Sequence, residues 1–275
     1  MTDDVRLGAR DLSLGYGGTA IVEGLTVDVA AGAVTAIVGP NACGKSTLLR
    51  GLARLMSPAA GQVILDGSDI TRLKTKDVAR KLGLLPQSSI APEGITVADL
   101  VTRGRFPHQT MLRQFSRDDQ QAVADAMAAT GVTAIAGRPV DQLSGGQRQR
   151  VWIAMVLAQQ TPLILLDEPT TFLDIAHQIE LLDLFGDLNA EQGRTIVAVL
   201  HDLNHACRFA DQIIAMKAGS IVAQGNPAEV ITAALVEEVY GLKCQVIDDP
   251  ETGTPLVVPR ASARMRARRQ DSTRR

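Results

Sequence analysis

Hydrophobic and polar positions follow two patterns that alternate along the chain. Aliphatic runs at 33–38, 163–166 and 195–200 have almost no polar interruption, which is typical of strands buried on both faces of a parallel sheet. Helical patterns lie between such runs, and the segment 45–55 is one of them. Alternating strands and helices predict an α/β fold with a mainly parallel sheet.

From about residue 88 to residue 160 the pattern is mostly helical. Ser116 has the residue type of an N-cap, and we expect a helix from there to about Ala129. The segment 145–159 predicts a second helix. This stretch therefore predicts a helical subdomain, at about 88–160, inserted into the α/β core.

Composition narrows the class of protein. The 275 residues are 45% hydrophobic and 21% charged with a net charge of −2, which suits an ordinary globular domain and gives no field for nucleic acid. Aromatic residues make up 3%, which also argues against a base-stacking surface, so we expect no specific nucleic-acid partner. No apolar run approaches the roughly 18–20 residues of a membrane-spanning helix. If the chain works at a membrane, another chain must cross it.

The two ends and the cysteines predict a chain of the reducing cytosol. The first residues are acidic and lack the apolar block of a secretory signal. Three widely spaced cysteines, Cys43, Cys207 and Cys244, suggest neither disulfides nor a metal site. After a domain spanning 1–259, the segment 260–275 is rich in arginine and poor in large aliphatic residues, so we expect it to be disordered. It is either a solvated tail or a contact for anionic lipid headgroups or RNA.

The strongest local motif follows the strand predicted at 33–38. It matches G-x-x-x-x-G-K-[ST] and opens a predicted helix, the context that supports a phosphate-binding loop. Its residues are Gly39, Pro40, Asn41, Ala42, Cys43, Gly44, Lys45, Ser46 and Thr47. In such a loop, backbone N–H groups and the helix N-terminus surround phosphate oxygens. Lys45 is expected to neutralise the β- and γ-phosphates of ATP, and Ser46 to ligate Mg²⁺.

Two acids follow the buried strand predicted at 163–166. Asp167 and Glu168 would lie at the carboxyl edge of the sheet, where ligands of α/β proteins bind. Two acids there are often an ordinary strand end, but beside a phosphate loop the functional interpretation is favoured. We expect Asp167 to hold Mg²⁺, directly or through water, and Glu168 to polarise the attacking water.

A third motif, Leu143-Ser144-Gly145-Gly146-Gln147, precedes the acidic strand by one predicted helix. Serine and glycines at a helix start can form a second anion site. This segment, hereafter the signature segment, matches the signature of ABC ATPases, and with the motifs above the chain resembles the ATP-binding subunits of ABC transporters. The resemblance implies a P-loop NTPase core with a mainly parallel sheet, an N-terminal antiparallel β region and an inserted helical subdomain.

The resemblance also implies roles for single residues at matching positions. Tyr16 is similar to the aromatic residue that stacks on adenine. Gln87 matches the glutamine that senses Mg²⁺ and the γ-phosphate. Asp174 belongs to the loop that crosses the dimer interface, and His201 matches the switch histidine that contacts the γ-phosphate. Each of these residues alone could equally be structural.

Four further segments, 103–108, 152–155, 177–180 and 201–204, resemble the importers of ferric siderophores and vitamin B12, most closely the ferric enterobactin type. The resemblance implies a homodimer in which each ATP lies between the phosphate loop of one chain and the signature segment of the other. It also implies a peripheral position at the cytoplasmic face of the cell membrane, a separate transmembrane permease and, indirectly, a substrate-binding protein.

Other functions remain open at this point. A vitamin B12 or haem importer would use the same ATPase. A soluble ABC ATPase acting on DNA or ribosomes usually carries a coiled-coil insertion or a second cassette, and neither is present in this sequence. A non-hydrolysing regulatory module would follow if turnover were abolished.

Ala42 departs from the family, which usually has glycine at this position. We expect a positive φ there, which costs a residue other than glycine roughly 1–2 kcal/mol. The methyl group also lies near the expected phosphates, so we expect ATP binding or turnover to be weaker than with glycine.

Overall fold

The computed structural model describes residues 5–88, 90–109 and 115–261. In chain order its elements are β1 (Val5–Tyr16), β2 (Thr19–Ala30), β3 (Val34–Val38), α1 (Lys45–Leu52), β4 (Ala60–Leu65), β5 (Ser68–Asp69), η1 (Ile70–Arg72), α2 (Thr75–Lys81), β6 (Leu82–Leu85), α3 (Val97–Thr102), η2 (Arg103–His108), α4 (Arg117–Ala129), η3 (Thr133–Ile135), η4 (Val140–Gln142), α5 (Gly145–Ala158), β7 (Leu163–Asp167), α6 (Ile175–Gln192), β8 (Thr195–Val199), α7 (Leu203–Phe209), β9 (Gln212–Lys217), β10 (Ser220–Gly225), α8 (Pro227–Val230), α9 (Ala233–Tyr240), β11 (Cys244–Asp248) and β12 (Pro255–Pro259).

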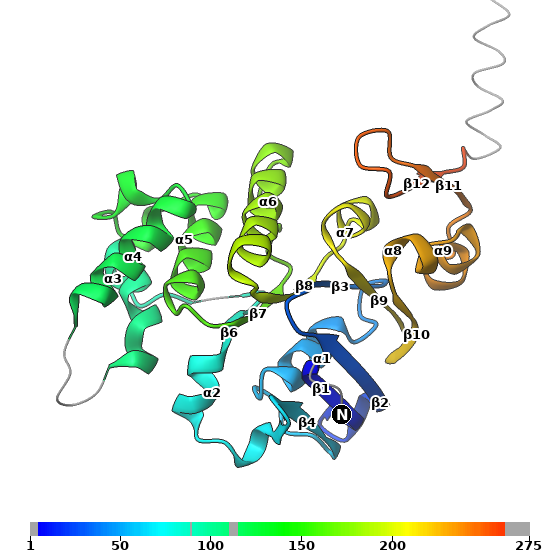
Figure 1. Ribbon diagram of the computed structural model, residues 1–275, viewed down its shortest axis with the longest axis horizontal. Coiled ribbons are helices and arrows are strands. Elements are labelled where there is room, and N and C mark those ends of the chain that lie inside the picture. Colours follow the sequence, from blue (N-terminus) through cyan, green and yellow to red (C-terminus); the bar gives the residue numbers. More distant parts are fainter. Residues whose placement is uncertain (1–4, 89, 110–114, 262–275) are drawn as a thin grey trace, which may run out of the picture.

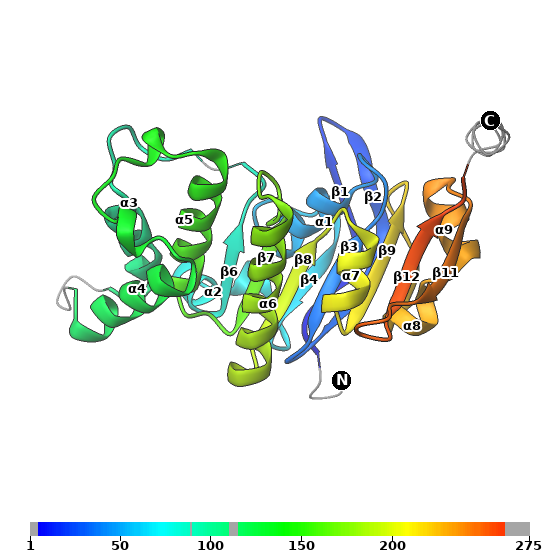
Figure 2. The same ribbon diagram turned by 90° about the horizontal axis from the view of Figure 1, so that it is seen from above.

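The central sheet has six strands in the order β10-β9-β3-β8-β7-β6. Its pairs from β9 to β6 are parallel, and β10 joins the edge antiparallel to β9. A second sheet, β2-β1-β4-β5, is antiparallel and lies at the N-terminal side, and β11 pairs with β12 near the end of the chain (Figures 1 and 2). The predicted α/β fold with a mainly parallel sheet and an N-terminal antiparallel region is confirmed.

The central strands are buried on both faces, as their unbroken aliphatic sequences predict. Successive side chains of a strand point to opposite faces. In β7, Ile164 and Leu166 belong to the core on the side of α5 and α6, whereas Leu163 and Leu165 belong to the core shared with α1 and the N-terminal sheet. Two cores therefore sandwich the sheet, and a polar residue would be unfavourable on either face of β7.

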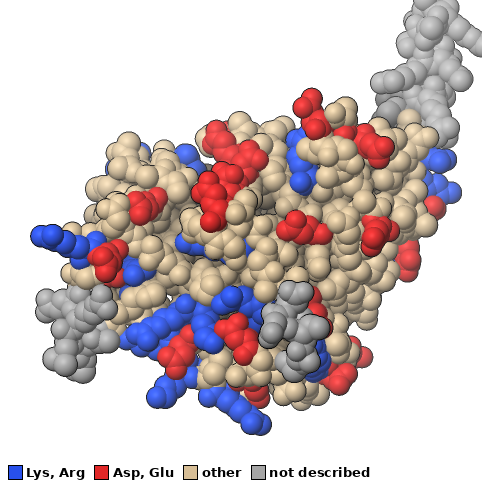
Figure 3. Space-filling view, viewed as in Figure 1, with Lys and Arg blue, Asp and Glu red and all other residues tan. Residues whose placement is uncertain are grey.

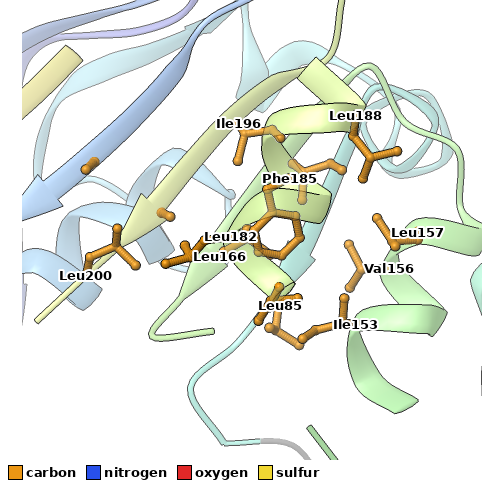
Figure 4. Packing of buried hydrophobic residues seen from close by; sticks show 14 of the residues in the cluster. Leu85, Ile153, Val156, Leu157, Leu166, Leu182, Phe185, Leu188, Ile196 and Leu200 are labelled. Atoms are coloured by element: carbon orange, nitrogen blue, oxygen red, sulfur yellow. The ribbon is translucent and has the colours of Figure 1, made fainter. Parts of the chain in front are cut away.

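Helix α6 packs between the central sheet and the helices inserted between β6 and β7. Figure 4 shows Phe185 of α6 in the middle of this packing, with Leu182 and Leu166 on one side and Val156 and Leu157 of α5 on the other. All of these side chains are buried. The position of α5 relative to the sheet is therefore set mainly by apolar contacts.

The ends of the helices test the expectations from sequence. Ser116 is the N-cap of α4, which ends at Ala129 as predicted. Helix α1 is shorter than the predicted segment 45–55, because Arg54 adopts a left-handed conformation with a φ of 60°. Its N–H bonds to the Gly51 carbonyl and the next N–H reaches back to Arg50, which is a Schellman ending. No glycine occurs at this helix end, so the helix predicted from the sequence extends past the observed end.

A buried ion pair holds the helical segment together. Arg105 of η2 donates to the Asp119 carboxylate of α4 at 2.8 Å and to the Ala158 carbonyl of α5 at 2.8 Å. Burial opposes ionisation of Asp119, but hydrogen bonds from Ser116 and Arg105 outweigh it and lower the pKa to about 2. Arg105, part of the segment 103–108 that resembles the siderophore branch, thus has a packing role.

The described surface carries charges of both signs. Figure 3 shows Lys and Arg gathered over the region of α2, with Asp and Glu among them. Within the described ranges no helix is long and apolar enough to cross a membrane. Residues 262–275, most of the arginine-rich segment, lie outside the described residues. The division into a domain at 1–259 and a tail therefore stays a prediction.

Candidate nucleotide-binding site

A cavity of about 510 Å³ opens at the carboxyl edge of the central sheet. Its walls come from the N-terminal sheet, the loop 39–47 and the ends of strands β6, β7 and β8. The lining residues are Tyr16, Ile21, Asn41, Ala42, Gly44, Lys45, Ser46, Thr47, Gln87, Glu168 and His201. Tyr16 is 48% exposed, and its hydroxyl accepts a hydrogen bond from Arg50 at 3.2 Å. Seven of the fifteen residues predicted to bind nucleotide therefore line this cavity, together with the predicted catalytic residues Gln87, Glu168 and His201.

The loop 39–47 has a backbone that requires glycine at two positions. Gly39 and Gly44 have φ values of 151° and 104°. A β-carbon at Gly39 would lie 2.3 Å from the Met216 carbonyl oxygen, a contact that no side chain tolerates. Lys45 is only 5% exposed, and its Nζ donates to the carbonyls of Gly39 at 2.7 Å and Pro40 at 2.9 Å. The loop is closed around its own lysine.

Ala42 has a φ of 61°, so the expected positive φ is confirmed. A residue other than glycine, asparagine or aspartate is disfavoured there by roughly 1–2 kcal/mol. Ala42 also lines the cavity, so its methyl group lies close to the volume available to a ligand.

Cys43 differs from its neighbours in the loop. Its side chain is 4% exposed and packs in the core under the N-terminal sheet, and it does not line the cavity. The Cys43 carbonyl accepts a hydrogen bond from the Gly219 N–H. The Cys43 side chain therefore packs away from the cavity, although the sequence analysis placed Cys43 among the nucleotide-binding residues.

Two oxygen donors lie side by side below the loop. Ser46 donates from Oγ to Oδ1 of Asp167 at 2.8 Å, and Asp167 is 1% exposed. Burial raises the pKa of Asp167, and the hydrogen bond from Ser46 opposes this shift. Across the described residues no group of three or more His, Cys, Asp or Glu could hold a metal. This pair of hard donors suits Mg²⁺, which keeps most of its water and takes phosphate oxygens.

Glu168 is the centre of a second polar group. Its Oε1 lies 2.8 Å from Nε2 of His201, and Gln87 also hydrogen-bonds to its carboxylate. Burial alone would raise the pKa of Glu168, but these hydrogen bonds hold it below its ordinary value. Glu168, His201 and Gln87, which the sequence analysis named separately, are therefore in contact in the structure.

The backbone of Glu168 is a feature that the sequence did not predict. Its φ is 56°, in the left-handed region. Such strain concentrates at functional sites, where the surrounding structure enforces it. Two strained residues, Ala42 and Glu168, therefore face the same cavity.

The signature segment lies at a different cavity, of about 430 Å³. It is lined by Ser144, Gly145, Gly146, Gln147, Arg150, Phe172, Leu173, Asp174 and His177. None of these residues lines the first cavity. The predicted phosphate loop and signature segment are therefore not brought together within one chain.

The loop before α6 packs directly on the signature segment. A β-carbon at Gly145 would lie 3.3 Å from Cβ of Phe172, which is tighter than ordinary contact. Asp174 caps α6 and accepts a hydrogen bond from Nδ1 of His177 at 2.7 Å. Phe172 is 74% exposed with a φ of 67°. The sequence singled out His177 only as part of the segment 177–180 and did not single out Phe172, which is marked only by its packing on Gly145.

Comparison with known proteins agrees with this geometry. The family described as ABC transporter matches residues 22–171. The chain is 58% identical to the ferric enterobactin transport ATP-binding protein FepC of Escherichia coli (strain K12), over 94% of this chain and 96% of that one. It is 52% identical to the petrobactin import ATP-binding protein FpuD of Bacillus anthracis, over 94% of each. The ATP-binding cassette MJ0796, solved as a post-hydrolysis dimer with ADP and Pi, is 27% identical with a TM-score of 0.72, covering 80% of this chain and 98% of that one. The chain belongs to the ABC transporter family, as one of its ATP-hydrolysing members.

Proposed function

We propose that this chain supplies ATP hydrolysis to an importer of iron(III)–siderophore complexes. The observation that carries the proposal is the high identity, over nearly the whole chain, to relatives named for the import of such iron complexes. The segments 103–108 and 201–204, which resemble the same branch, support it.

In this proposal the first cavity binds ATP. Tyr16 stacks on adenine, the backbone of the loop 39–47 surrounds the phosphates, and Lys45 neutralises their charge. Ser46, Asp167 and Gln87 would hold Mg²⁺, directly or through water, and a bound Mg²⁺ would neutralise charge that develops on the phosphates. The adjacent oxygens of Ser46 and Asp167, 2.8 Å apart, support this assignment.

Glu168 orients and polarises the water that attacks the γ-phosphate. Its pKa below the ordinary value keeps it ionised at neutral pH, as a proton acceptor must be. His201 contacts both Glu168 and the γ-phosphate, so it links the acid to the nucleotide. Gln87 contacts Glu168 from the end of β6 and reports on the bound nucleotide.

The chain works as a head-to-tail homodimer. The cavity that contains Lys45 and the cavity that contains Ser144 have no residue in common, so one chain alone lacks half of the site. In the dimer, Ser144 and Gly146 of one chain would close over the ATP held by the other, with Asp174 at the interface.

A mixing experiment tests the dimer. Ser144→Arg blocks the signature segment and Lys45→Ala disables the phosphate loop, so each variant alone should hydrolyse almost no ATP. A mixture contains heterodimers in which one composite site is intact, and its rate should rise above either variant. A mixture of Ser144→Arg with wild-type chain is the control for dilution. A mixture as inactive as its parts would reject the head-to-tail arrangement, or show that both sites must act together.

We further propose that the dimer lies at the cytoplasmic face of the membrane, against a separate permease, and that a substrate-binding protein acts through that permease. The helices inserted between β6 and β7 are the candidate coupling element, because Gln87 lies between the end of β6 and these helices. Closure on ATP would move these helices relative to the sheet.

Uptake in the organism that carries the gene tests the cargo. Replacing the chain by Glu168→Gln should abolish uptake of radio-iron given as an iron(III)–siderophore and leave uptake of labelled haem and vitamin B12 unchanged. Glu191→Gln, an exposed acid at the end of α6, is the matched control. Loss of haem or vitamin B12 uptake instead would correct the cargo. Loss of none of the three would favour an ABC ATPase outside transport.

A further inference from the structure

The C-terminal hairpin, β11 with β12, lies beside the helix that follows the switch histidine. Figures 1 and 2 show β12 next to α7, and the two elements are in contact. Val257 of β12 and Cys244 of β11 are 7% and 3% exposed and belong to the same core as Ala206 and Cys207 of α7. The hairpin thus covers a helix face that would otherwise be open to water.

Asn204 connects this helix to the hairpin. Its Oδ1 accepts the Val257 N–H at 2.7 Å, and its Nδ2 donates to the Val257 carbonyl at 3.4 Å. A primary amide has the same donor and acceptor as a peptide group, so Asn204 takes the place of a neighbouring strand along the outer edge of β12. This edge would otherwise leave polar backbone groups unpaired in a half-buried place.

The contact is close in sequence to the catalytic edge. His201 lies two residues after the end of β8. Asp202 caps α7 by accepting hydrogen bonds from the N–H groups of Asn204 and His205, and Asn204 is in the first turn of α7. The His201 side chain is 45% exposed, and its Nε2 contacts the Glu168 carboxylate. Its position therefore depends on the short segment that β8 holds at one end and Asn204 at the other.

We propose that Asn204 is a positioning residue for ATP hydrolysis: by bonding to Val257 of the C-terminal hairpin, it holds the first turn of α7 and so aligns His201 with Glu168. The inference rests on the role proposed above for His201. It gives the hairpin, more than forty residues away along the chain, a part in the hydrolytic site.

A second contact between the same two elements provides a matched control. Arg208, in the last turn of α7, pairs with Asp249 of the hairpin turn at 3.1 Å. This ion pair also ties the hairpin to α7, but it lies at the end of the helix away from His201. Loss of either contact should loosen the hairpin, whereas only loss of the Asn204 contact should disturb His201.

The test compares Asn204→Leu with Arg208→Gln in the full chain, at a temperature well below unfolding. Asn204→Leu should lower kcat for ATP about fivefold, equivalent to about 1 kcal/mol or one net hydrogen bond, with little change in the KM for ATP. Arg208→Gln should leave kcat unchanged. Both variants should lower the thermal midpoint, so stability alone does not distinguish them. Equal losses of kcat in the two variants, or none in Asn204→Leu, would overturn the proposal.

Val257→Pro tests the other side of the contact. In the wild type the Val257 N–H donates to Asn204, and proline has no N–H to donate. Proline is tolerated at this position of an edge strand because the missing N–H does not face the neighbouring strand. Val257→Pro should lower kcat as Asn204→Leu does, and the double variant should be no slower than either single one. An additive double variant would overturn the proposal.

His201→Ala separates this inference from the role of His201. It should lower kcat, and adding Asn204→Leu should then have no further effect. If His201→Ala hydrolyses ATP at the wild-type rate, the role proposed for His201 is wrong and the positioning role fails with it. If only His201→Ala lowers kcat, the positioning role alone is wrong.

Discussion

Two carboxylates in this chain make contacts of the same length with very different surroundings. Asp119 lies 2.8 Å from Arg105 among the inserted helices, and both side chains are almost fully buried, at 7% and 6% exposure. Glu168 lies 2.8 Å from His201 at the nucleotide cavity, where the histidine is 45% exposed. The first pair is enclosed by protein, and the second opens onto a cavity.

The difference separates stability from function. The Arg105 side chain donates only to protein groups in these contacts. Removal of the Asp119 carboxylate therefore leaves the buried Arg105 charge without a counter-ion and without solvent in its place. Around Glu168 the open side can admit water and nucleotide, so its contacts are exchangeable. Disrupting the Arg105–Asp119 pair should therefore lower the free energy of unfolding. Disrupting the His201–Glu168 pair should slow ATP hydrolysis.

Glu168→Gln should give the largest effect. Removing a general base lowers turnover by about 10²–10⁴-fold, while the amide preserves shape and should leave ATP binding and the thermal midpoint nearly unchanged. The measurements are steady-state hydrolysis, ATP affinity and thermal unfolding of the purified protein. Lys45→Ala is the contrasting variant, because it should weaken binding itself. Normal turnover in Glu168→Gln would refute the role of the acid.

Asp119→Asn should affect stability instead. Leaving Arg105 buried without its carboxylate should lower the free energy of unfolding by about 3–5 kcal/mol, with kcat unchanged in the folded protein. Denaturant unfolding and hydrolysis measure the two quantities. Asp125→Asn, an exposed acid on the same helix, is the control and should stay within about 0.5 kcal/mol of wild type. A fall in kcat without a fall in stability would contradict the comparison.

The same pair should make stability depend on pH in the acid range. The pKa of Asp119 is lowered from 3.8 to about 2, so its contribution is complete above 3.8 and is lost as pH falls towards 2. Wild type should be more stable than Asp119→Asn above pH 3.8, and the difference between them should narrow as pH falls through 2. Unfolding midpoints across this range measure the difference. A constant difference down to pH 2 would show that Asp119 does not titrate as described.

Ala42→Gly should give the smallest effect, in the opposite direction. Glycine relieves the positive φ, and removal of the methyl group lets the loop amides approach phosphate more closely. We expect tighter ATP binding and faster turnover by up to about tenfold, or roughly 1.4 kcal/mol. Stability should change little, because glycine also gains freedom in the unfolded chain. Identical binding and hydrolysis would make Ala42 a neutral variant, and slower hydrolysis would contradict this account of the loop.

Features encoded by local pattern were predictable from the sequence. The buried runs became β3, β7 and β8, Ser116 became the N-cap of α4, and the positive φ at Ala42 followed from a glycine expected at that position. Each depends on a few neighbouring residues or on a known motif. Their local physics is therefore visible in the chain itself.

Features that depend on distant partners were not predictable. Nothing near Arg105 in the sequence indicates that it meets Asp119 and the Ala158 carbonyl, because three separate elements must first pack together. The inward turn of Cys43 and the contact of Asn204 with Val257 are of the same kind. The left-handed backbones of Arg54 and Glu168 occur in residues with no preference for that conformation, so they are imposed by the surrounding fold.

The enclosed Lys45 affects what ligand binding has to accomplish. Its ammonium group is already out of bulk water and already held by two carbonyl oxygens, so folding has met the cost of dehydrating it. A phosphate group that arrives therefore meets a cation that is stripped of solvent and oriented in advance. Folding of the loop therefore contributes to its affinity for polyphosphate. A substitution elsewhere that loosens the fold around Gly39 and Pro40 should weaken nucleotide binding, even if the substituted residue does not contact the nucleotide.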